Sequence, residues 1–141
     1  MIKRYVGGLL ILTGCFGVEK DMFSFKQLKA TEIGEINIIN LSKSAFSDTL
    51  RVTSDSLKSI LIESFHKSQT IVPGRVFSED NYRINIYNNS NAHIYTVDVM
   101  FEKVNVIGVV YGVGEYSNMR LGNIKLSWEK DFFMNLSRNM H

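Results

Sequence analysis

Apolar and polar residues alternate along residues 81–114, and turn-forming residues interrupt the alternation twice. The first interruption runs from Asn88 to Asn91, and the second lies near Glu102 to Asn105. Alternation with a period of two is typical of strands that bury one face, and asparagine tolerates the backbone angles of tight turns. The stretch therefore predicts three consecutive antiparallel strands joined by two hairpin turns.

One face of these strands is expected to form the core. The residues that the expected register places on it are Ile84, Ile86, His93, Tyr95, Val97, Val99, Phe101, Val106 and Val110. Gly108 and Gly112 share this face and are expected to leave room for a bulky helix side chain.

The opposite face of the third strand is also apolar, with Ile107, Val109, Tyr111 and Val113. A strand that is apolar on both faces is usually covered on both sides. Either the N-terminal strands fold over this face, or a bulge shifts the register, or the face is partly exposed and binds a protein. The candidate protein-binding residues are Arg83, Asn85, Tyr87, Ile107, Val109 and Tyr111.

Upstream of these strands the pattern predicts further elements. Phe23, Phe25 and Leu28 alternate like a first edge strand, residues 33–41 are rich in β-branched residues, and residues 49–53 favour another short strand.

Two amphipathic helices are expected. Ser54 or Asp55 caps the first, which runs to about Ser68 and presents one apolar stripe, with the charged residues elsewhere on the helix. The stripe consists of Leu57, Ile60, Leu61 and Phe65, and the charged residues are Lys58, Glu63 and Lys67. Ser127 is expected to cap the second, with Trp128, Phe132, Phe133 and Leu136 at helical spacing. The predicted fold is α+β: an antiparallel sheet of about four to six strands with one or two helices packed on one face.

The N-terminal segment combines Lys3 and Arg4 with a short apolar run and ends in Leu12-Thr13-Gly14-Cys15. This order resembles the signal and lipobox of bacterial lipoproteins. The resemblance implies cleavage after Gly14 and a lipid on Cys15. Residues 1–14 then form a signal peptide, residues 15–22 a short tether, and residues 23–141 a single domain.

Export places the protein in the periplasm, and Phe16 after the cysteine implies the outer membrane by the rule for enteric lipoproteins. The absence of any second cysteine fits an oxidising compartment. Because the apolar run is short, secretion as a freely soluble periplasmic protein is the alternative.

Composition and net charge limit the classes of binding partner that we expect. The chain has 141 residues, 45% of them hydrophobic, as expected for one globular domain. Its 16 basic residues, less the two in the signal, balance its 14 acidic residues, so the mature net charge is zero. No charge excess remains to attract nucleic acid.

The sequence shows no pattern that predicts catalysis, a metal or a cofactor. His66, His93 and His141 lack metal-ligand spacing, and Gly108 with Gly112 lacks the lysine and the helix of a phosphate loop. No G-x-S-x-G motif is present, and the adjacent Glu79 and Asp80 are typical of a solvated turn. We therefore expect a protein that is not an enzyme.

A small, exported, non-catalytic α+β chain of this kind resembles the bacteriocin immunity proteins. Its size, export signal and aromatic, strand-rich body are most similar to the pesticin immunity family, which guards the periplasm against a peptidoglycan-cleaving muramidase. No motif matches residue by residue, so the resemblance implies no particular binding residue. It implies a protein partner, a peptidoglycan-degrading bacteriocin, that is neutralised by binding. An envelope assembly or surface-exclusion lipoprotein is the alternative.

Overall fold

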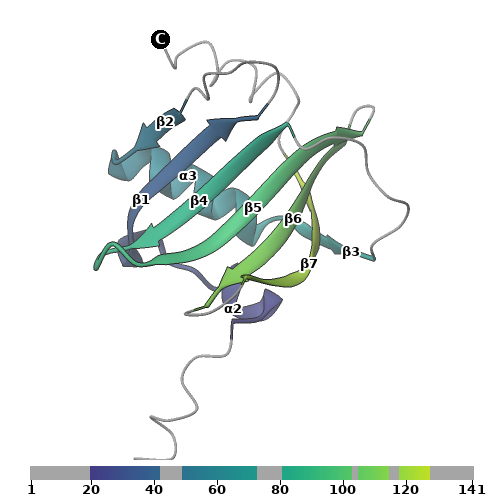
Figure 1. Ribbon diagram of the computed structural model, residues 1–141, viewed down its shortest axis with the longest axis horizontal. Helices are drawn as coiled ribbons and strands as arrows, with labels where there is room; N and C mark the ends of the chain where they lie inside the picture. Colours follow the sequence, from purple (N-terminus) through teal and green to yellow (C-terminus); the bar gives the residue numbers. More distant parts are fainter. Residues whose placement is uncertain (1–19, 42–48, 73–80, 103–104, 115–117, 128–141) are drawn as a thin grey trace, which may run out of the picture.

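The computed structural model describes residues 20–41, 49–72, 81–102, 105–114 and 118–127. These residues form one antiparallel sheet of seven strands with two α-helices on one side (Figure 1). The strands, in chain order, are β1 (Ile33–Asn40), β2 (Thr49–Val52), β3 (Gln69–Ile71), β4 (Tyr82–Asn88), β5 (His93–Glu102), β6 (Asn105–Val113) and β7 (Asn118–Leu126). The predicted α+β class is confirmed, with one strand more than the largest number expected.

The strand order is β2-β1-β4-β5-β6-β7-β3, so β2 and β3, which follow each other in the chain, lie at opposite edges of the sheet and need a long connection. The helix α3 (Asp55–His66) makes this connection, because it follows β2 at one edge and precedes β3 at the other. In Figure 1 it crosses behind the middle strands. The core lies between this helix and the sheet, and its fully buried members include Ile36, Ile84, Val97 and Phe65.

The predicted three-stranded stretch is confirmed. Asn88 ends β4, and its side-chain Oδ1 accepts hydrogen bonds from the backbone N–H groups of Ser90 and Ala92, both at 2.9 Å. Asn91 adopts a φ of 62°, the left-handed conformation that asparagine tolerates. Glu102 pairs with Asn105 where the second turn was expected.

The N-terminal prediction is wrong. Phe23 and Phe25 lie in a short helix, α2 (Met22–Lys26), rather than in an edge strand. The N–H of Ser24 donates to Asp21 Oδ1 at 2.6 Å, which caps the helix and lowers the pKa of this carboxyl. Phe25 is buried against Phe65, with ring centroids 5.1 Å apart, while Phe23 points to solvent. Residues 20–22, expected in the tether, are therefore part of the fold.

The helix α3 begins after Ser54 as predicted, since Ser54 Oγ accepts from Leu57 N at 3.3 Å, but its buried face differs from the expected stripe. Ile60 is 50% exposed, whereas Lys58 is only 8% exposed. The helix therefore packs through Lys58, Leu61, Ile62 and Phe65.

The two strand glycines do not receive a helix side chain. A Cβ at Gly108 would lie 2.8 Å from Val97 Cγ1 and 3.1 Å from Ile124 Cγ1, so side chains of the neighbouring strands fill this space. A Cβ at Gly112 would lie 2.8 Å from Lys20 Cβ. The Lys20 ammonium also donates to the carbonyl oxygen of Val113. The expected second helix from Ser127, with Trp128 to Leu136, lies outside the described residues.

Candidate functional site

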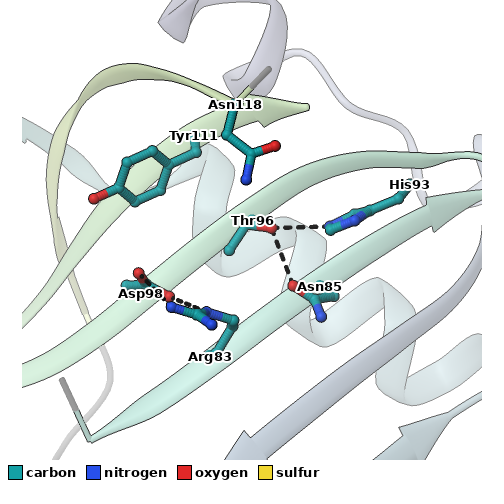
Figure 2. A pocket seen from close by; sticks show the side chains of 7 residues that line it. All are labelled: Arg83, Asn85, His93, Thr96, Asp98, Tyr111 and Asn118. Carbon is teal, nitrogen blue, oxygen red and sulfur yellow. Dashed lines mark hydrogen bonds and ion pairs between the residues drawn. The ribbon is translucent and has the colours of Figure 1, made fainter. Parts of the chain in front are cut away.

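A polar cavity of about 400 Å³ opens on the side of the sheet opposite α3 (Figure 2). We call it the polar cavity; its lining residues are Arg83, Asn85, His93, Thr96, Asp98, Tyr111 and Asn118. They come from β4, β5, β6 and β7, so strands rather than loops hold most of the site. The buried side chains of Thr96 and Asp98 form its floor.

The pairing of the strands explains why these side chains meet. Asn85 lies opposite Thr96, and Thr96 lies opposite Tyr111 on the next strand. Arg83 lies opposite Asp98, two residues along the same pair of strands. Side chains that face each other across antiparallel strands have Cβ atoms about 5 Å apart, so these two cross-strand pairs bring polar groups within hydrogen-bonding reach.

A β-bulge brings His93 into the cavity. Tyr87 pairs with His93 and Ile86 with Tyr95, so Ile94 is an extra residue on β5. Ile94 and Tyr95 both contact the core side, while His93 contacts Thr96 on the cavity side. The prediction that His93 lies on the core face is therefore wrong, because the expected register had no bulge.

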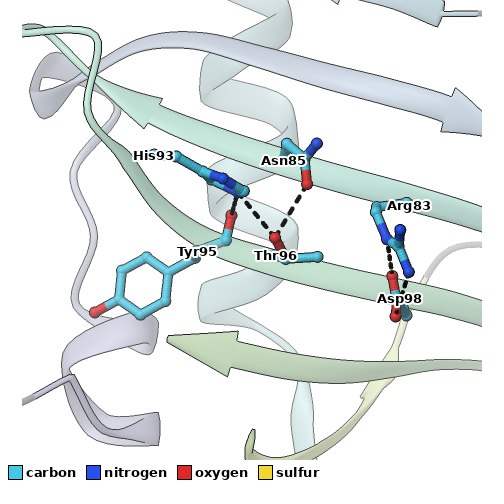
Figure 3. A network of polar contacts seen from close by, with 6 residues as sticks. All are labelled: Arg83, Asn85, His93, Tyr95, Thr96 and Asp98. Atoms are coloured by element: carbon cyan, nitrogen blue, oxygen red, sulfur yellow. Dashed lines mark hydrogen bonds and ion pairs between the residues drawn. The ribbon is translucent and has the colours of Figure 1, made fainter. Parts of the chain in front are cut away.

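A chain of hydrogen bonds fixes the orientation of the His93 ring (Figure 3). The Thr96 hydroxyl donates to Asn85 Oδ1 at 3.0 Å, so Thr96 Oγ1 accepts from His93 Nε2, which is 2.8 Å away. His93 Nε2 is also 3.1 Å from the carbonyl oxygen of Tyr95. The proton of the neutral ring therefore lies on Nε2, and Nδ1 is an acceptor.

Burial lowers the pKa of His93, and the positive charge of Lys20 adds to this effect, while the hydrogen bond to the Tyr95 carbonyl opposes it. His93 is therefore neutral at pH 7. Tyr87 stacks on the imidazole, with ring centroids 4.9 Å apart.

Arg83 and Asp98 form a two-point ion pair. Arg83 Nε donates to Asp98 Oδ1 at 2.8 Å and Arg83 Nη2 to Oδ2 at 3.2 Å. The carboxylate lies in the buried floor and the guanidinium is half exposed. Because the pair neutralises itself and His93 is neutral, the charged and titratable lining of the polar cavity carries no net charge.

This arrangement favours binding over nucleophilic catalysis. An attacking hydroxyl needs a base that takes its proton, but His93 donates a hydrogen bond to Thr96, and the Thr96 hydroxyl donates to the amide oxygen of Asn85, which is not a base. The cavity instead offers mixed hydrogen-bond donors and acceptors on rigid strands. Such a surface suits an uncharged polar group.

The six candidate protein-binding residues fall into three groups. Arg83, Asn85 and Tyr111 line the polar cavity, and Tyr87 supports it through His93. Ile107 and Val109 are only 3% and 5% exposed, so the alternative in which these residues form a partly exposed apolar surface is wrong. They form a small buried cluster with Met100. The strands β1 and β2 do not cover this face, because they extend the same sheet.

Sequence reasoning did not assign His93, Thr96, Asp98 and Asn118 to the site. Thr96 and Asp98 alternate with the core residues Val97 and Val99, so their polarity in a strongly apolar strand was a usable signal for this face. His93 was hidden by the bulge. Asn118 begins β7, a strand that was not predicted.

Gly14 and Cys15 lie outside the described residues. Within the described segments, no group of three or more His, Cys, Asp or Glu side chains could hold a metal ion. None of the helices in the described part of the chain is both long and apolar enough to cross a membrane.

Comparisons with family models, with curated proteins and with solved structures returned no match to this chain. The functional argument therefore rests on the residues themselves.

Proposed function

We propose that this protein binds another protein through the polar cavity and the surface around it, and performs no catalysis of its own. The observation that carries the proposal is the prearranged lining: two cross-strand pairs hold Arg83–Asp98 and Asn85–Thr96–His93 in fixed hydrogen bonds. Groups already fixed before binding lose little conformational entropy when a partner arrives.

The partner that we propose is a peptidoglycan-degrading bacteriocin, which the protein neutralises in the periplasm. This proposal is supported by the lipoprotein-like leader, by the zero net charge of the mature chain and by the resemblance to immunity proteins. An inhibitor needs a rigid contact surface but no reactive group, and the polar cavity has that character.

The expected interface is of ordinary size for a specific complex, about 1,200–2,000 Å² in total. Tyr111 at the cavity wall is the proposed anchor, because tyrosine is enriched among residues that dominate binding energy. Since the cavity has no net charge, we expect the affinity to depend little on salt.

We also propose that Cys15 anchors the protein to a membrane, most simply the outer membrane. The residues between Cys15 and Lys20 span at most roughly 20 Å when extended. An anchored domain would therefore stay close to the lipid surface, where an incoming toxin passes. Cells fed a clickable fatty acid should label the wild-type chain and not Cys15→Ser; equal labelling of both, or labelling of neither, would show that this cysteine carries no lipid.

The immunity proposal is tested by survival. Sensitive cells that produce the full chain are exposed to a panel of peptidoglycan-cleaving bacteriocins, and colonies are counted against cells with an empty vector. We expect protection against one toxin or a small related group. If the producing cells die like the controls against every member, the immunity proposal fails, and an envelope-assembly role becomes the leading one.

A further inference from the structure

A second cavity lies on the helix side of the sheet, where the start of α3 meets the 3₁₀ helix η1 (Ala30–Glu32) and the β4–β5 turn. Its volume is about 390 Å³. We call it the Lys58 cavity; its lining residues are Ala30, Thr31, Ile33, Asp55, Lys58, Ser59 and Asn89. It shares no residue with the polar cavity.

The ammonium group of Lys58 is buried at this cavity and has two partners. Its Nζ donates to the carbonyl oxygen of Ile33 at 3.0 Å and lies 3.2 Å from Asp55 Oδ1. An ammonium has three protons to donate, so one remains directed to neither partner. A buried cation is costly unless it is well paired, and Lys58 is only 8% exposed.

The existing ion pair compensates this charge weakly. The Asp55 side chain is 99% exposed, so water and salt screen its attraction to Lys58. Asp55 is also the first residue of α3, where the helix dipole stabilises a carboxylate without Lys58. Asp55 can therefore leave the ammonium at little cost.

The rim of the Lys58 cavity is fixed and supplies further donors. Asn89 Nδ2 donates to the carbonyl oxygen of Thr31 at 2.8 Å, and the Asn89 backbone N–H donates to the Glu32 carbonyl oxygen at 3.2 Å. These bonds hold η1 to the β4–β5 turn. The hydroxyl groups of Thr31 and Ser59 line the same space and can donate to an anion.

We propose that the Lys58 cavity binds a carboxylate group, which takes the place of Asp55 at the Lys58 ammonium. A single positive charge beside Asp55 suits a monoanion better than a doubly charged phosphate. The carboxylate can belong to a free small acid or to an acidic side chain of a protein. This inference does not depend on the proposed function of the polar cavity.

The test is an NMR titration of the full chain with sodium acetate at pH 7. Sodium acetate replaces an equal concentration of sodium chloride at each step, so the ionic strength stays constant. The proposal predicts saturable shifts at the amides of Thr31 and Ser59 and at the Lys58 side chain. Lys58→Met should abolish them, while Lys67→Met, a matched change at the exposed lysine that directly follows the same helix, should leave them unchanged.

Asp55→Asn keeps the test decisive if Lys58→Met does not fold. Because this substitution removes the competing carboxylate, acetate should bind about two- to fivefold more tightly. Unchanged or weaker binding to Asp55→Asn, shifts that grow linearly with acetate, or shifts that persist in a folded Lys58→Met would overturn the proposal.

A second arm replaces acetate with N-acetylglutamate amide, which presents the carboxylate of a protein side chain. Tighter binding than acetate supports the site and assigns it to a protein partner. Equal or weaker binding, with the acetate shifts as predicted, supports the site and assigns it to a free small acid.

Discussion

His93 is the residue whose charge most directly affects the polar cavity. Protonation would place a positive charge in a partly buried position near the Lys20 ammonium, so burial first, and the charge of Lys20 second, lower the pKa of His93. When a histidine pKa is lower in the folded than in the unfolded state, the unfolded chain binds the proton first as the pH falls. His93 therefore contributes its full share of stability above the ordinary histidine pKa, about 6.5, and loses it below that value.

This residue predicts a measurable pH dependence. The free energy of unfolding, measured with urea, should fall as the pH is lowered from 7.5 through the region below about 6.5. In His93→Gln, which keeps a hydrogen-bonding side chain but does not titrate, this part of the fall should disappear. An NMR titration that places the His93 pKa at or above the ordinary histidine value would contradict the assignment.

At the scale of single elements, regular alternation is what made the fold predictable. Strands β4, β5 and β6 have long alternating patterns and an asparagine-rich turn, and they were found with nearly correct ends. The helix α3 was found from its cap and its apolar spacing. The buried face of α3 was not predicted correctly, because a lysine can bury its aliphatic chain while its ammonium group donates a hydrogen bond. Lys58 does this with the carbonyl oxygen of Ile33.

The missed strand β7 and the misplaced His93 share a physical cause: within each strand, an irregularity changes which face the alternate residues occupy. In β7 the apolar residues lie at Met119 and Leu121 and then at Ile124 and Leu126, because the strand is irregular near Gly122, where φ is 153°. The bulge on β5 moved His93 in the same way. A bulge inserts one residue, and every side chain before it changes face relative to a regular pattern.

The short elements α2 and β3 were not predicted for a different reason. The five residues of α2 bury only Phe25, so Phe23 and Phe25 resembled a strand. The three residues of β3 carry no pattern at all and depend on pairing with β7. Arg83 and Asn85 of the polar cavity were predictable from the polar positions of β4, while His93 and Asn118 needed the tertiary structure.

Gly108 gives a direct test of strand packing in the core. Gly108→Ala would bring a methyl group to 2.8 Å from Val97 Cγ1 and 3.1 Å from Ile124 Cγ1, both fully buried neighbours. Overpacking of this kind costs about 1–3 kcal/mol, so the midpoint of urea unfolding should fall. Gly114→Ala, at the end of the same segment and outside the strand, is the control. An unchanged midpoint in Gly108→Ala would show that β5, β6 and β7 pack less tightly than described.

At the scale of the whole molecule, the two sides of the sheet differ in character. One side is covered by α2 and α3 over a continuous apolar core, and the other combines a small buried cluster around Ile107 with the polar cavity. The fold alone does not specify a function, because one architecture can serve many. The proposal of an inhibitor therefore depends on the fixed, neutral lining of the polar cavity and on the export signal that the N-terminal sequence predicts.

The most direct test of this account uses a toxin that the survival experiment identifies and asks whether the protein inhibits the cell-wall hydrolysis that this toxin catalyses. Purified full chain is titrated into a fixed amount of that toxin, and peptidoglycan release is followed. The account predicts complete inhibition at one protein per toxin, with Tyr111→Ala and Asn118→Ala at least about tenfold weaker. Arg51→Ala, on β2 away from the cavity, should inhibit like wild type. No inhibition by the wild type, or equal inhibition by all four chains, would contradict the account.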